Sequence, residues 1–481
     1  MKISFINPVL GGDYSALDIA ATTLSAYLNQ RTVHKAKICD LTFHRKNWQI
    51  FLNQHIKDSR PDIIGISTTA LYMPYVKQLI QKVKSDYGLP VVLGGYQASI
   101  YPKESLNIKG VDFVCIGDGE YALASLMDRL ENKLSIAGLA GVGYREAGTS
   151  IINPGGSFIE DIDSLPIVDW DAWQDLDRYF YFLGMLYIIG TRGCPYQCSY
   201  CDAVGISRAV KGNYYRLRSP EGYAREIAFQ WNKYRKRGMR LAQLFDQVFT
   251  MDANWLDKFC GEYRRLGLAQ ELKFSAFSRV DHLDEGKIKM LGESGCAILR
   301  VGIEAGDEFI RNKIYGKHIS NNKIRSIVKL CRRYKVGLTA YYMLGGPAET
   351  RETINATIKL AGELKASRSA FFIYKPFTEI GIQQITEHGG RIDQKLWDRA
   401  DNITFDAVVE LKGIKPRQIE FLQKKAYFLT FGARLLNMLF SQGLRYFTRL
   451  FAYCAKGLAY GLDIRYLLIY YHIYGYDNVD K

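Results

Sequence analysis

The stretch Gly193-Cys194-Pro195-Tyr196-Gln197-Cys198-Ser199-Tyr200-Cys201 decides which fold is expected for this chain. It follows the apolar run 187–190, which predicts that the three cysteines lie on one short loop at the end of a strand. Three thiolates can hold three irons of a cubane iron–sulfur cluster and leave the fourth iron open to a ligand. A structural zinc site or three unrelated buried thiols are the alternatives, but no second CxxC pair or nearby histidine completes a zinc site.

The CxxxCxxC spacing, with the aromatic Tyr200 directly before the last cysteine, resembles the cluster loop of the radical S-adenosylmethionine (SAM) superfamily. The resemblance implies a [4Fe-4S] cluster held by Cys194, Cys198 and Cys201, with SAM bound at the open iron through its amino and carboxylate groups. It also implies that one electron from the cluster breaks a carbon–sulfur bond of SAM, which yields a radical able to remove hydrogen from an unactivated carbon. An external electron donor such as flavodoxin or ferredoxin is therefore expected.

The composition is typical of a large folded protein in a reducing compartment. A chain of 481 residues exceeds the size of a single core, so about two to three domains are expected. The nine cysteines are too scattered for a disulfide framework, and the cluster loop needs reduced thiols, so a cytoplasmic location is expected. The sequence shows no signal peptide and no apolar run long enough to span a membrane. The net charge of +15 favours anionic partners, but without a recognisable RNA-binding module nucleic acid is not expected.

Residues 1–150 alternate short apolar segments with amphipathic ones. Strands are expected at 3–6, 36–41, 62–67, 90–93 and 112–116, and helices at 16–28, 48–56 and 74–83. This alternation predicts an α/β domain with a Rossmann-like, doubly wound parallel sheet covered by helices on both faces.

Ligands of such sheets bind beyond the carboxyl ends of the strands. Small or polar residues follow the strands there, which suits a large, mostly neutral cofactor better than a bare pyrophosphate. These residues are Ser67, Thr68, Gly94, Gly95, Gln97, Gly117, Gly119 and Glu120. Tight turns of a domain without a ligand are the alternative.

A small hairpin is expected at 140–152, and residues 151–185 form a linker whose aromatic side chains at 170–182 are expected to pack between domains. The alternation of strand-like and helix-like segments over residues 186–385 predicts a second α/β domain. Its strands are expected at 186–189, 242–245, 273–277, 297–303, 337–344 and 370–373, and its helices include 221–234, 255–266, 322–334 and 352–364. Six such units predict an open partial (β/α)6 barrel, whose chemistry lies at the carboxyl ends of its strands.

The order of the two domains resembles the cobalamin-dependent radical SAM family over residues 1–385. The matching segments of the first domain are Asp62-Ile63-Ile64-Gly65-Ile66-Ser67, Gly94-Gly95-Tyr96-Gln97-Ala98-Ser99 and Gly117-Asp118-Gly119-Glu120. The resemblance implies that this domain binds cobalamin through the eight strand-end residues named above. No DxHxxG run is present to supply a cobalt ligand, and Gln97 stands where many members carry histidine, so no residue is assigned to the cobalt.

The resemblance also implies a set of SAM contacts in the barrel, namely Tyr200, Arg279, Glu304, Gly345, Gly346 and Pro347. Glu304 would bind the amino or ribose groups of SAM, Arg279 would lie near its methionine carboxylate, and Tyr200 would pack by the adenine edge. The Gly345-Gly346-Pro347 turn would let the adenine approach the backbone. A mutual salt bridge between Glu304 and Arg279 is the structural alternative.

Residues 386–481 predict a mostly helical C-terminal subdomain rich in aromatic residues. Apolar residues recur at helical spacing at Leu436, Phe440, Phe447, Phe451, Cys454 and Leu458. Residues 424–465 hold seven basic residues against one acid, Asp463. Such a segment can lie on an anionic membrane surface or form a lid over the barrel mouth, and either role suggests an apolar substrate.

The resemblance and these residues together predict an enzyme that methylates an unactivated carbon of a small or lipid-like substrate with SAM and methylcobalamin. Oxidative cyclisation or rearrangement with the same cofactors is the alternative among enzymes. A cobalamin or redox sensor is the non-enzymatic alternative, but it would not need Glu304 or the Gly345-Gly346-Pro347 turn. No catalytic side chain is assigned, since no Ser-His-Asp set or carboxylate pair stands out, and Cys296 is expected in a packed turn.

Overall fold

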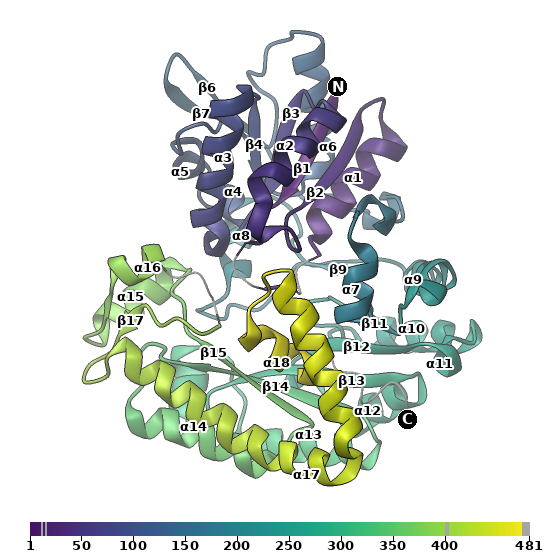
Figure 1. Ribbon diagram of the computed structural model, residues 1–481, viewed down its shortest axis with the longest axis vertical. Coiled ribbons are helices and arrows are strands. Elements are labelled where there is room, and N and C mark those ends of the chain that lie inside the picture. The colour runs from purple at the N-terminus through teal and green to yellow at the C-terminus, as the bar shows by residue number, and fades with distance from the viewer. Residues whose placement is uncertain (11–12, 15–16, 400–403, 474–481) are drawn as a thin grey trace. The chain divides into compact units, whose positions relative to one another are not determined.

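The computed structural model describes residues 1–10, 13–14, 17–399 and 404–473, with the backbone alone for residues 399, 431–446 and 472–473. The chain forms two compact units (Figure 1). Unit 1 consists of Met1–Tyr179, Asp202–Arg216 and Gly457–Tyr466. Unit 2 consists of Phe180–Cys201, Leu217–Lys456 and the segment from Leu467 onward. Neither unit is one uninterrupted stretch of chain.

Unit 1 is built on a seven-stranded sheet. In spatial order its strands are β2 (Lys35–Asp40), β1 (Lys2–Asn7), β3 (Ile63–Ser67), β4 (Val91–Gly94), β5 (Phe113–Cys115), β6 (Val142–Glu146) and β7 (Thr149–Ile152). The strands from β2 to β5 run parallel, as predicted. The predicted hairpin at 140–152 forms β6 and β7, which extend the sheet with antiparallel pairing, so the sheet is mixed at this edge.

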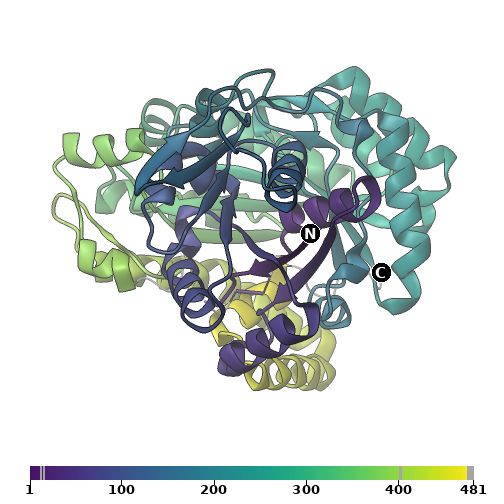
Figure 2. The ribbon, with the colours of Figure 1, turned by 90° about the horizontal axis from the view of Figure 1, so that it is seen from above.

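Helices cover both faces of this sheet (Figure 2). On one face, α2 (Trp48–Ser59) and α3 (Met73–Tyr87) share a buried apolar core with the strands. On the other face, α1 (Ile19–Arg31) and α6 (Gly119–Glu131) lie side by side. Because both faces are buried, the central strands β3, β4 and β5 are apolar at nearly every position. The doubly wound, Rossmann-like architecture is thereby confirmed.

Two later segments of chain complete unit 1. Residues 202–216 contribute α8 (Asp202–Ala209), which packs on α4 (Gly95–Ile100) so closely that a Cβ at Gly205 would lie 2.9 Å from Ile100 Cδ1. Residues 457–466 return near the end of the chain, where Lys46 Nζ donates hydrogen bonds to the carbonyls of Leu458 (3.1 Å) and Ala459 (3.3 Å).

Unit 2 is built on a six-stranded parallel sheet in which consecutive strands are neighbours. In spatial order these are β15 (Arg368–Ile373), β14 (Gly337–Leu344), β13 (Cys296–Glu304), β12 (Lys273–Ser278), β11 (Leu241–Leu244) and β8 (Met185–Ile188). The connecting helices include α9 (Pro220–Tyr234), α10 (Ala253–Arg265), α12 (Glu285–Glu293), α13 (Asn321–Arg333) and α14 (Arg351–Leu364). All six predicted strands are present, and this strand order is that of the predicted open, partial barrel.

The C-terminal part of unit 2 is mostly helical, as predicted. It contains α15 (Glu379–Glu387), β16 (Arg391–Ile392), α16 (Gln394–Arg399), β17 (Val409–Glu410), α17 (Pro416–Ala459) and α18 (Ile464–Ile473), the last shared with unit 1. Among the described residues, no helix is both long and apolar enough to cross a membrane. The side chains of Leu436 and Phe440, predicted on the apolar face, lie outside the described residues.

The start of α17 covers the edge strand of the barrel. The Tyr427 hydroxyl accepts a hydrogen bond from the Phe371 amide (3.1 Å), and Gln423 Nε2 donates to the Phe371 carbonyl (2.7 Å). The same face of α17 buries Ile419 and Ala426. These contacts satisfy backbone groups that an exposed edge strand would leave open to another chain.

Candidate functional site

The cysteine loop is held in place by hydrogen bonds to other parts of unit 2. The amide of Cys201 donates to the carbonyl of Cys198 (3.0 Å), which makes a tight turn between two of the thiols. Ser199 Oγ donates to the carbonyl of Ile314 (2.7 Å), and the Ser199 carbonyl accepts from Thr378 Oγ1 (2.5 Å). Cys198 is buried, and burial raises the pKa of the Cys194 thiol.

Three thiols on one fixed loop are a donor set that fits an iron–sulfur cluster with one open iron. The six other cysteines of the chain are all buried, as expected of core residues. Cys296 follows Gly295, whose φ of 91° makes the turn into β13, and burial raises the pKa of Cys296 well above its usual range.

Arg279, which follows β12, is bound to the cysteine loop. Its Nη1 donates to Cys198 Sγ (3.4 Å), and its guanidinium carbon lies 3.6 Å from the centre of the Tyr196 ring. Its Nε and Nη2 form a two-bond pair with Asp281 (3.0 and 2.9 Å). The alternative of a salt bridge between Arg279 and Glu304 is thus wrong, because Arg279 pairs with Asp281.

Glu304 ends β13 in a strained conformation, with φ at 67° and an irregular register against β14. Its partner is Lys317, whose Nζ lies 2.8 Å from Glu304 Oε1, and the Tyr200 hydroxyl donates to the same oxygen (3.0 Å). The two charged side chains are only 5% and 9% exposed, so the pair is almost fully desolvated. A non-glycine residue held at positive φ beside a buried ion pair is typical of a functional site.

Lys317 was not predicted from the sequence. It lies after the π-helical turn Ile310–Ile314, and its backbone carbonyl also accepts a hydrogen bond from Arg279 Nη2 (3.0 Å). It therefore connects Glu304 to Arg279, two residues that the sequence had placed in the same site. Its only sequence signal is a lysine in a Gly-Lys-His turn, which by itself points to no function.

The Gly345-Gly346-Pro347 turn follows β14 and is buried. A Cβ at Gly346 would overlap the Tyr315 hydroxyl, and one at Gly345, which has a φ of 86°, would lie 2.8 Å from Ile419. Packing against the protein's own side chains therefore requires both glycines. Their role toward an adenine ring stays a prediction.

Glu349 closes this turn, since its Oε2 accepts hydrogen bonds from the amides of Gly345 (2.6 Å) and Gly346 (2.9 Å). Burial raises the pKa of the Glu349 carboxyl to about 8. Its Oε1 and the hydroxyls of Tyr315 and Tyr374 are buried and have no hydrogen-bond partner among the described residues. Buried polar atoms of this kind call for a ligand, so the strand ends fit the polar groups of SAM.

A row of aromatic rings crosses the face of the barrel sheet that carries Glu304. Adjacent ring centres lie 5.1 to 6.1 Å apart, in the order Tyr187, Phe245, Phe277, Tyr341 and Phe372. The opposite face packs on the helices, as Phe274 does against Phe259 and Tyr263 of α10. Phe245 is 44% exposed, so part of this row is open to an apolar ligand.

In unit 1, the eight predicted cofactor residues gather at the carboxyl ends of the adjacent strands β3, β4 and β5. Gly95, with a φ of 84°, brings β4 close to β3, because a Cβ there would lie 2.6 Å from the Thr68 carbonyl oxygen. Gly117, with a φ of 82°, donates its amide hydrogen to Ser99 Oγ (3.0 Å). Glu120 is buried in the first turn of α6, where Gly119 is the first residue.

The space at this edge fits a bulky, mostly neutral group. Apart from its own chain neighbours, no described residue has an atom within 4 Å of the position that a Cβ of Gly94 would take. Ser67 donates a hydrogen bond to Asp18, the N-terminal cap of α1, and burial raises the pKa of Asp18 to about 6. Asp18 was not predicted, although the pattern Asp before an apolar helix marks it as a cap.

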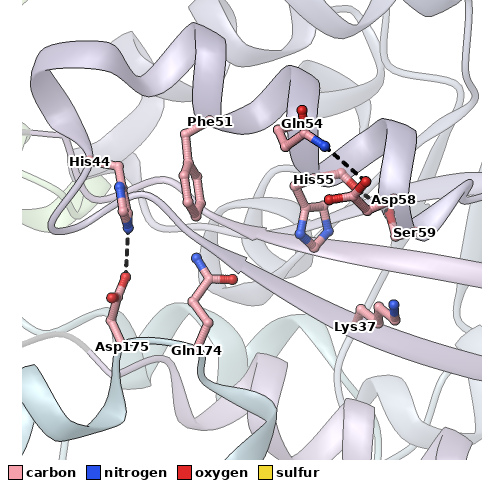
Figure 3. Close-up of a pocket in the computed structure, with 9 residues that line it drawn as sticks. All are labelled: Lys37, His44, Phe51, Gln54, His55, Asp58, Ser59, Gln174 and Asp175. Atoms are coloured by element: carbon pink, nitrogen blue, oxygen red, sulfur yellow. Dashed lines mark hydrogen bonds and ion pairs between the residues drawn. The ribbon is translucent and has the colours of Figure 1, made fainter.

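A cavity of about 390 Å³ lies elsewhere in unit 1, beside the edge strand β2 (Figure 3). His44 Nε2 and Asp175 Oδ2 are paired there at 2.8 Å, and His55 Nε2 lies 3.0 Å from Ser4 Oγ. Burial, aided by Lys37, lowers the pKa of His55 to about 4. None of the predicted site residues lines this cavity, and its histidines have partners within the protein.

These features define a protein with two cofactor domains. The model of the Radical SAM superfamily matches residues 188–361, and the model of the B12 binding domain matches residues 9–127. The chain belongs to the radical SAM proteins that carry a cobalamin-binding domain. The predicted cofactors, a [4Fe-4S] cluster, SAM and cobalamin, follow from these two domains.

Known proteins resemble the chain over most of its length. An uncharacterized methyltransferase of Pyrococcus horikoshii, PH0819, is 28% identical to this chain over 444 aligned residues. The alignment covers 89% of this chain and 92% of that protein. The anaerobic magnesium-protoporphyrin IX monomethyl ester cyclase of Cereibacter sphaeroides is 25% identical over 68% of this chain, which spans about half (53%) of that protein.

Among solved structures, the radical SAM methyltransferase TsrM of Kitasatospora setae, with cobalamin and [4Fe-4S] cluster bound, gives a TM-score of 0.67 at 18% identity. The match covers 82% of this chain and 77% of that one. The cobalamin-dependent radical enzyme OxsB gives a TM-score of 0.60 at 17% identity and covers 84% of this chain and 57% of its own. These likenesses confirm the fold class.

Proposed function

We propose that this protein is a C-methyltransferase that acts on an unactivated carbon of a small, apolar or lipid-like molecule. The observation that carries the proposal is a set of contacts at the strand ends of unit 2. Arg279 donates hydrogen bonds to Cys198 of the cysteine loop and to the carbonyl of Lys317, and Lys317 forms an ion pair with Glu304. The name of the relative PH0819 supports methyl transfer as the reaction class. When bound, the cluster with SAM would supply the hydrogen-abstracting radical, and cobalamin would supply the methyl group.

The protein's own residues would hold and orient these groups. Cys194, Cys198 and Cys201 would ligate the cluster as thiolates. Lys317 and Tyr200 both bind Glu304 Oε1, which fixes the carboxylate and leaves Oε2 for the amino or ribose groups of SAM. Arg279 is held rigid by Asp281, so one face of its guanidinium stays directed at the cysteine loop.

The strand ends of β3, β4 and β5 would hold cobalamin. Open space at Gly94 and neutral hydrogen-bonding groups such as Ser67 and Gln97 suit the amide-bearing edge of a corrin ring. No side chain is assigned to the cobalt itself. The partly exposed aromatic row supports an apolar substrate, because rings at these spacings bind flat or aliphatic surfaces without charge.

A reducing cytoplasm and an electron donor such as flavodoxin or ferredoxin belong to the same proposal. Both are supported by the need to keep the loop thiols reduced and to deliver one electron to the cluster.

The direct test is a reaction under anaerobic conditions. Protein reconstituted with iron, sulfide and hydroxocobalamin is mixed with dithionite, methyl-labelled SAM and an extract of small molecules and lipids from the source cells. Formation of deoxyadenosine together with a product that gains one labelled methyl group supports the proposal. Intact SAM under these conditions contradicts enzymatic activity and favours the sensor.

Oxidative cyclisation is the second candidate, because the cyclase of Cereibacter sphaeroides is among the relatives. It predicts deoxyadenosine and a product that has lost hydrogen and carries no label. The mass of the product separates it from methyl transfer.

A further inference from the structure

The first half of α17 has a second face that the barrel does not use. Phe421 and Phe428 are 67% and 77% exposed there, and Leu429 is 52% exposed. Lys424 and Lys425 are exposed between the two phenylalanines, and Arg417 is exposed one turn before Phe421. Residues 417, 421, 424 and 428 follow one another at helical spacing, so the cations and the phenyl rings share one face.

The opposite face of the same turns is fixed to the protein. Ile419, Gln423 and Ala426 are buried, and Gln423 is hydrogen-bonded to β15 at Phe371. The helix therefore cannot rotate to bury Phe421 and Phe428 without giving up its cover of the edge strand. The exposed rings are a permanent feature of the folded unit, and not the loose end of a helix.

The exposed face combines two properties. Two large apolar side chains are exposed to water, and moving them into an apolar environment would be favourable. Three cations stand beside them, and one of these, Lys425, donates a hydrogen bond from its Nζ to Asn355 Oδ1 (3.3 Å) at the protein surface. The only carboxylate in the same turns, Glu420, accepts a hydrogen bond from the Ala407 amide (3.0 Å). Such a face is complementary to a surface that is anionic outside and apolar beneath.

We propose that residues 416–430 of α17 bind the surface of an anionic lipid bilayer. Phe421, Phe428 and Leu429 enter the layer between headgroups and acyl chains, while Arg417, Lys424 and Lys425 contact lipid phosphates. The helix lies in the plane of the surface, which agrees with the finding that no described helix can cross a membrane. An enzyme bound in this way would take its substrate from the bilayer or its surface.

Vesicle sedimentation of the full-length, cluster-loaded protein tests the proposal. Vesicles of equal parts phosphatidylglycerol and phosphatidylcholine are compared with phosphatidylcholine alone. The protein is expected to sediment with the anionic vesicles and to be released by high salt. The variant K424E/K425E should lower the partition coefficient at least about 30-fold, because each lysine near an anionic surface contributes about fivefold.

The variant F421S/F428S should weaken binding to the same vesicles, with less dependence on salt than the lysine variant. F229S on α9, where Phe229 is 47% exposed, is the matched control and should bind as the wild type does. Circular dichroism and iron content establish that each variant is folded and loaded.

Failure of the wild type to sediment would overturn the proposal, as would equal binding of all variants. If the wild type is instead a dimer in size-exclusion chromatography and F421S/F428S makes it a monomer, the face belongs to a second copy of the chain. None of these outcomes depends on methyl transfer, because Phe421, Phe428 and the two lysines lie outside the proposed cofactor sites.

Discussion

The substitution Gly302→Ala would test whether the buried ion pair organises the SAM site. Gly302 lies on β13 two residues before Glu304, and its carbonyl accepts a hydrogen bond from Lys317 Nζ (2.7 Å). A Cβ at this position would overlap Glu304 Oε1 and lie 2.6 Å from Lys317 Nζ. One methyl group would thus disturb both charges without removing either.

The size of the effect follows from the burial of the pair. The side chains of Lys317 and Glu304 are 5% and 9% exposed, and removing one partner of a buried pair costs about 3–5 kcal/mol, which is the upper limit for displacing both. Replacing glycine by alanine in a strand returns about 0.5–1 kcal/mol through the unfolded state. We expect the free energy of unfolding to fall, by at most about 2–4 kcal/mol. If Glu304 holds SAM, loss of one charge-assisted hydrogen bond of about 1.5–3 kcal/mol should weaken SAM binding by about 10- to 100-fold.

Urea unfolding followed by circular dichroism would measure the first quantity, and equilibrium dialysis of labelled SAM against the cluster-loaded protein would measure the second. Gly362→Ala in α14 is the matched control, because the Cβ that it would add meets no described atom within 4 Å beyond its chain neighbours and the backbone of its own helix. That control should be as stable as the wild type or slightly more stable. A Gly302→Ala protein with the wild-type unfolding midpoint and SAM affinity would refute the role assigned to the ion pair.

Three further predictions concern single residues. Cys198→Ala should bind less iron on anaerobic reconstitution than the about four atoms per chain expected of the wild type. Cys331→Ala, which changes a cysteine of the core, should bind as much iron as the wild type, and iron analysis measures both variants. The pKa of Glu349 is raised by burial to about 8, so folding takes up a proton, and stability should fall as the pH rises from about 5 to 8. Glu349→Gln should remove this slope in unfolding experiments at several pH values, and an unchanged slope would contradict the assignment. Tyr427→Phe should remove the hydrogen-bond partner of the Phe371 amide, lower the free energy of unfolding by about 1 kcal/mol and speed the hydrogen exchange of that amide. Unchanged exchange would mean that α17 does not protect this strand.

The strands of both units could be predicted because each is a short apolar run followed by a glycine or a polar residue. The predicted strand 337–344 coincides with β14, and 273–277 differs from β12 by one residue. The helix expected from Ala16 begins instead at Ile19, since Asp18 caps it, and Ala16 itself lies outside the described residues. Capping chemistry would have placed this boundary better than the apolar period did.

The pairing of the site residues could not be read from the sequence. Arg279 and Glu304 carry opposite charges at neighbouring strand ends, yet Asp281 neutralises Arg279 and Lys317 neutralises Glu304. Lys317 follows a π-helical turn, and no local pattern of apolar residues signals that turn. Likewise, the need for Gly346 arises from Tyr315, thirty-one positions earlier, which only the folded chain brings near.

The return of residues 457–466 to unit 1 constrains how the molecule can be made. A ribosome exposes β1 and α2 early, but the carbonyls of Leu458 and Ala459 that bind Lys46 emerge only after all six strands of the barrel. The hydrogen bonds that these carbonyls accept therefore form only after the barrel has been translated, although the strands of unit 1 are all made before it. A truncation after Lys456 would remove residues 457–466 from unit 1 and the segment from Leu467 onward from unit 2. Deleting a continuous stretch of chain therefore cannot leave either unit complete.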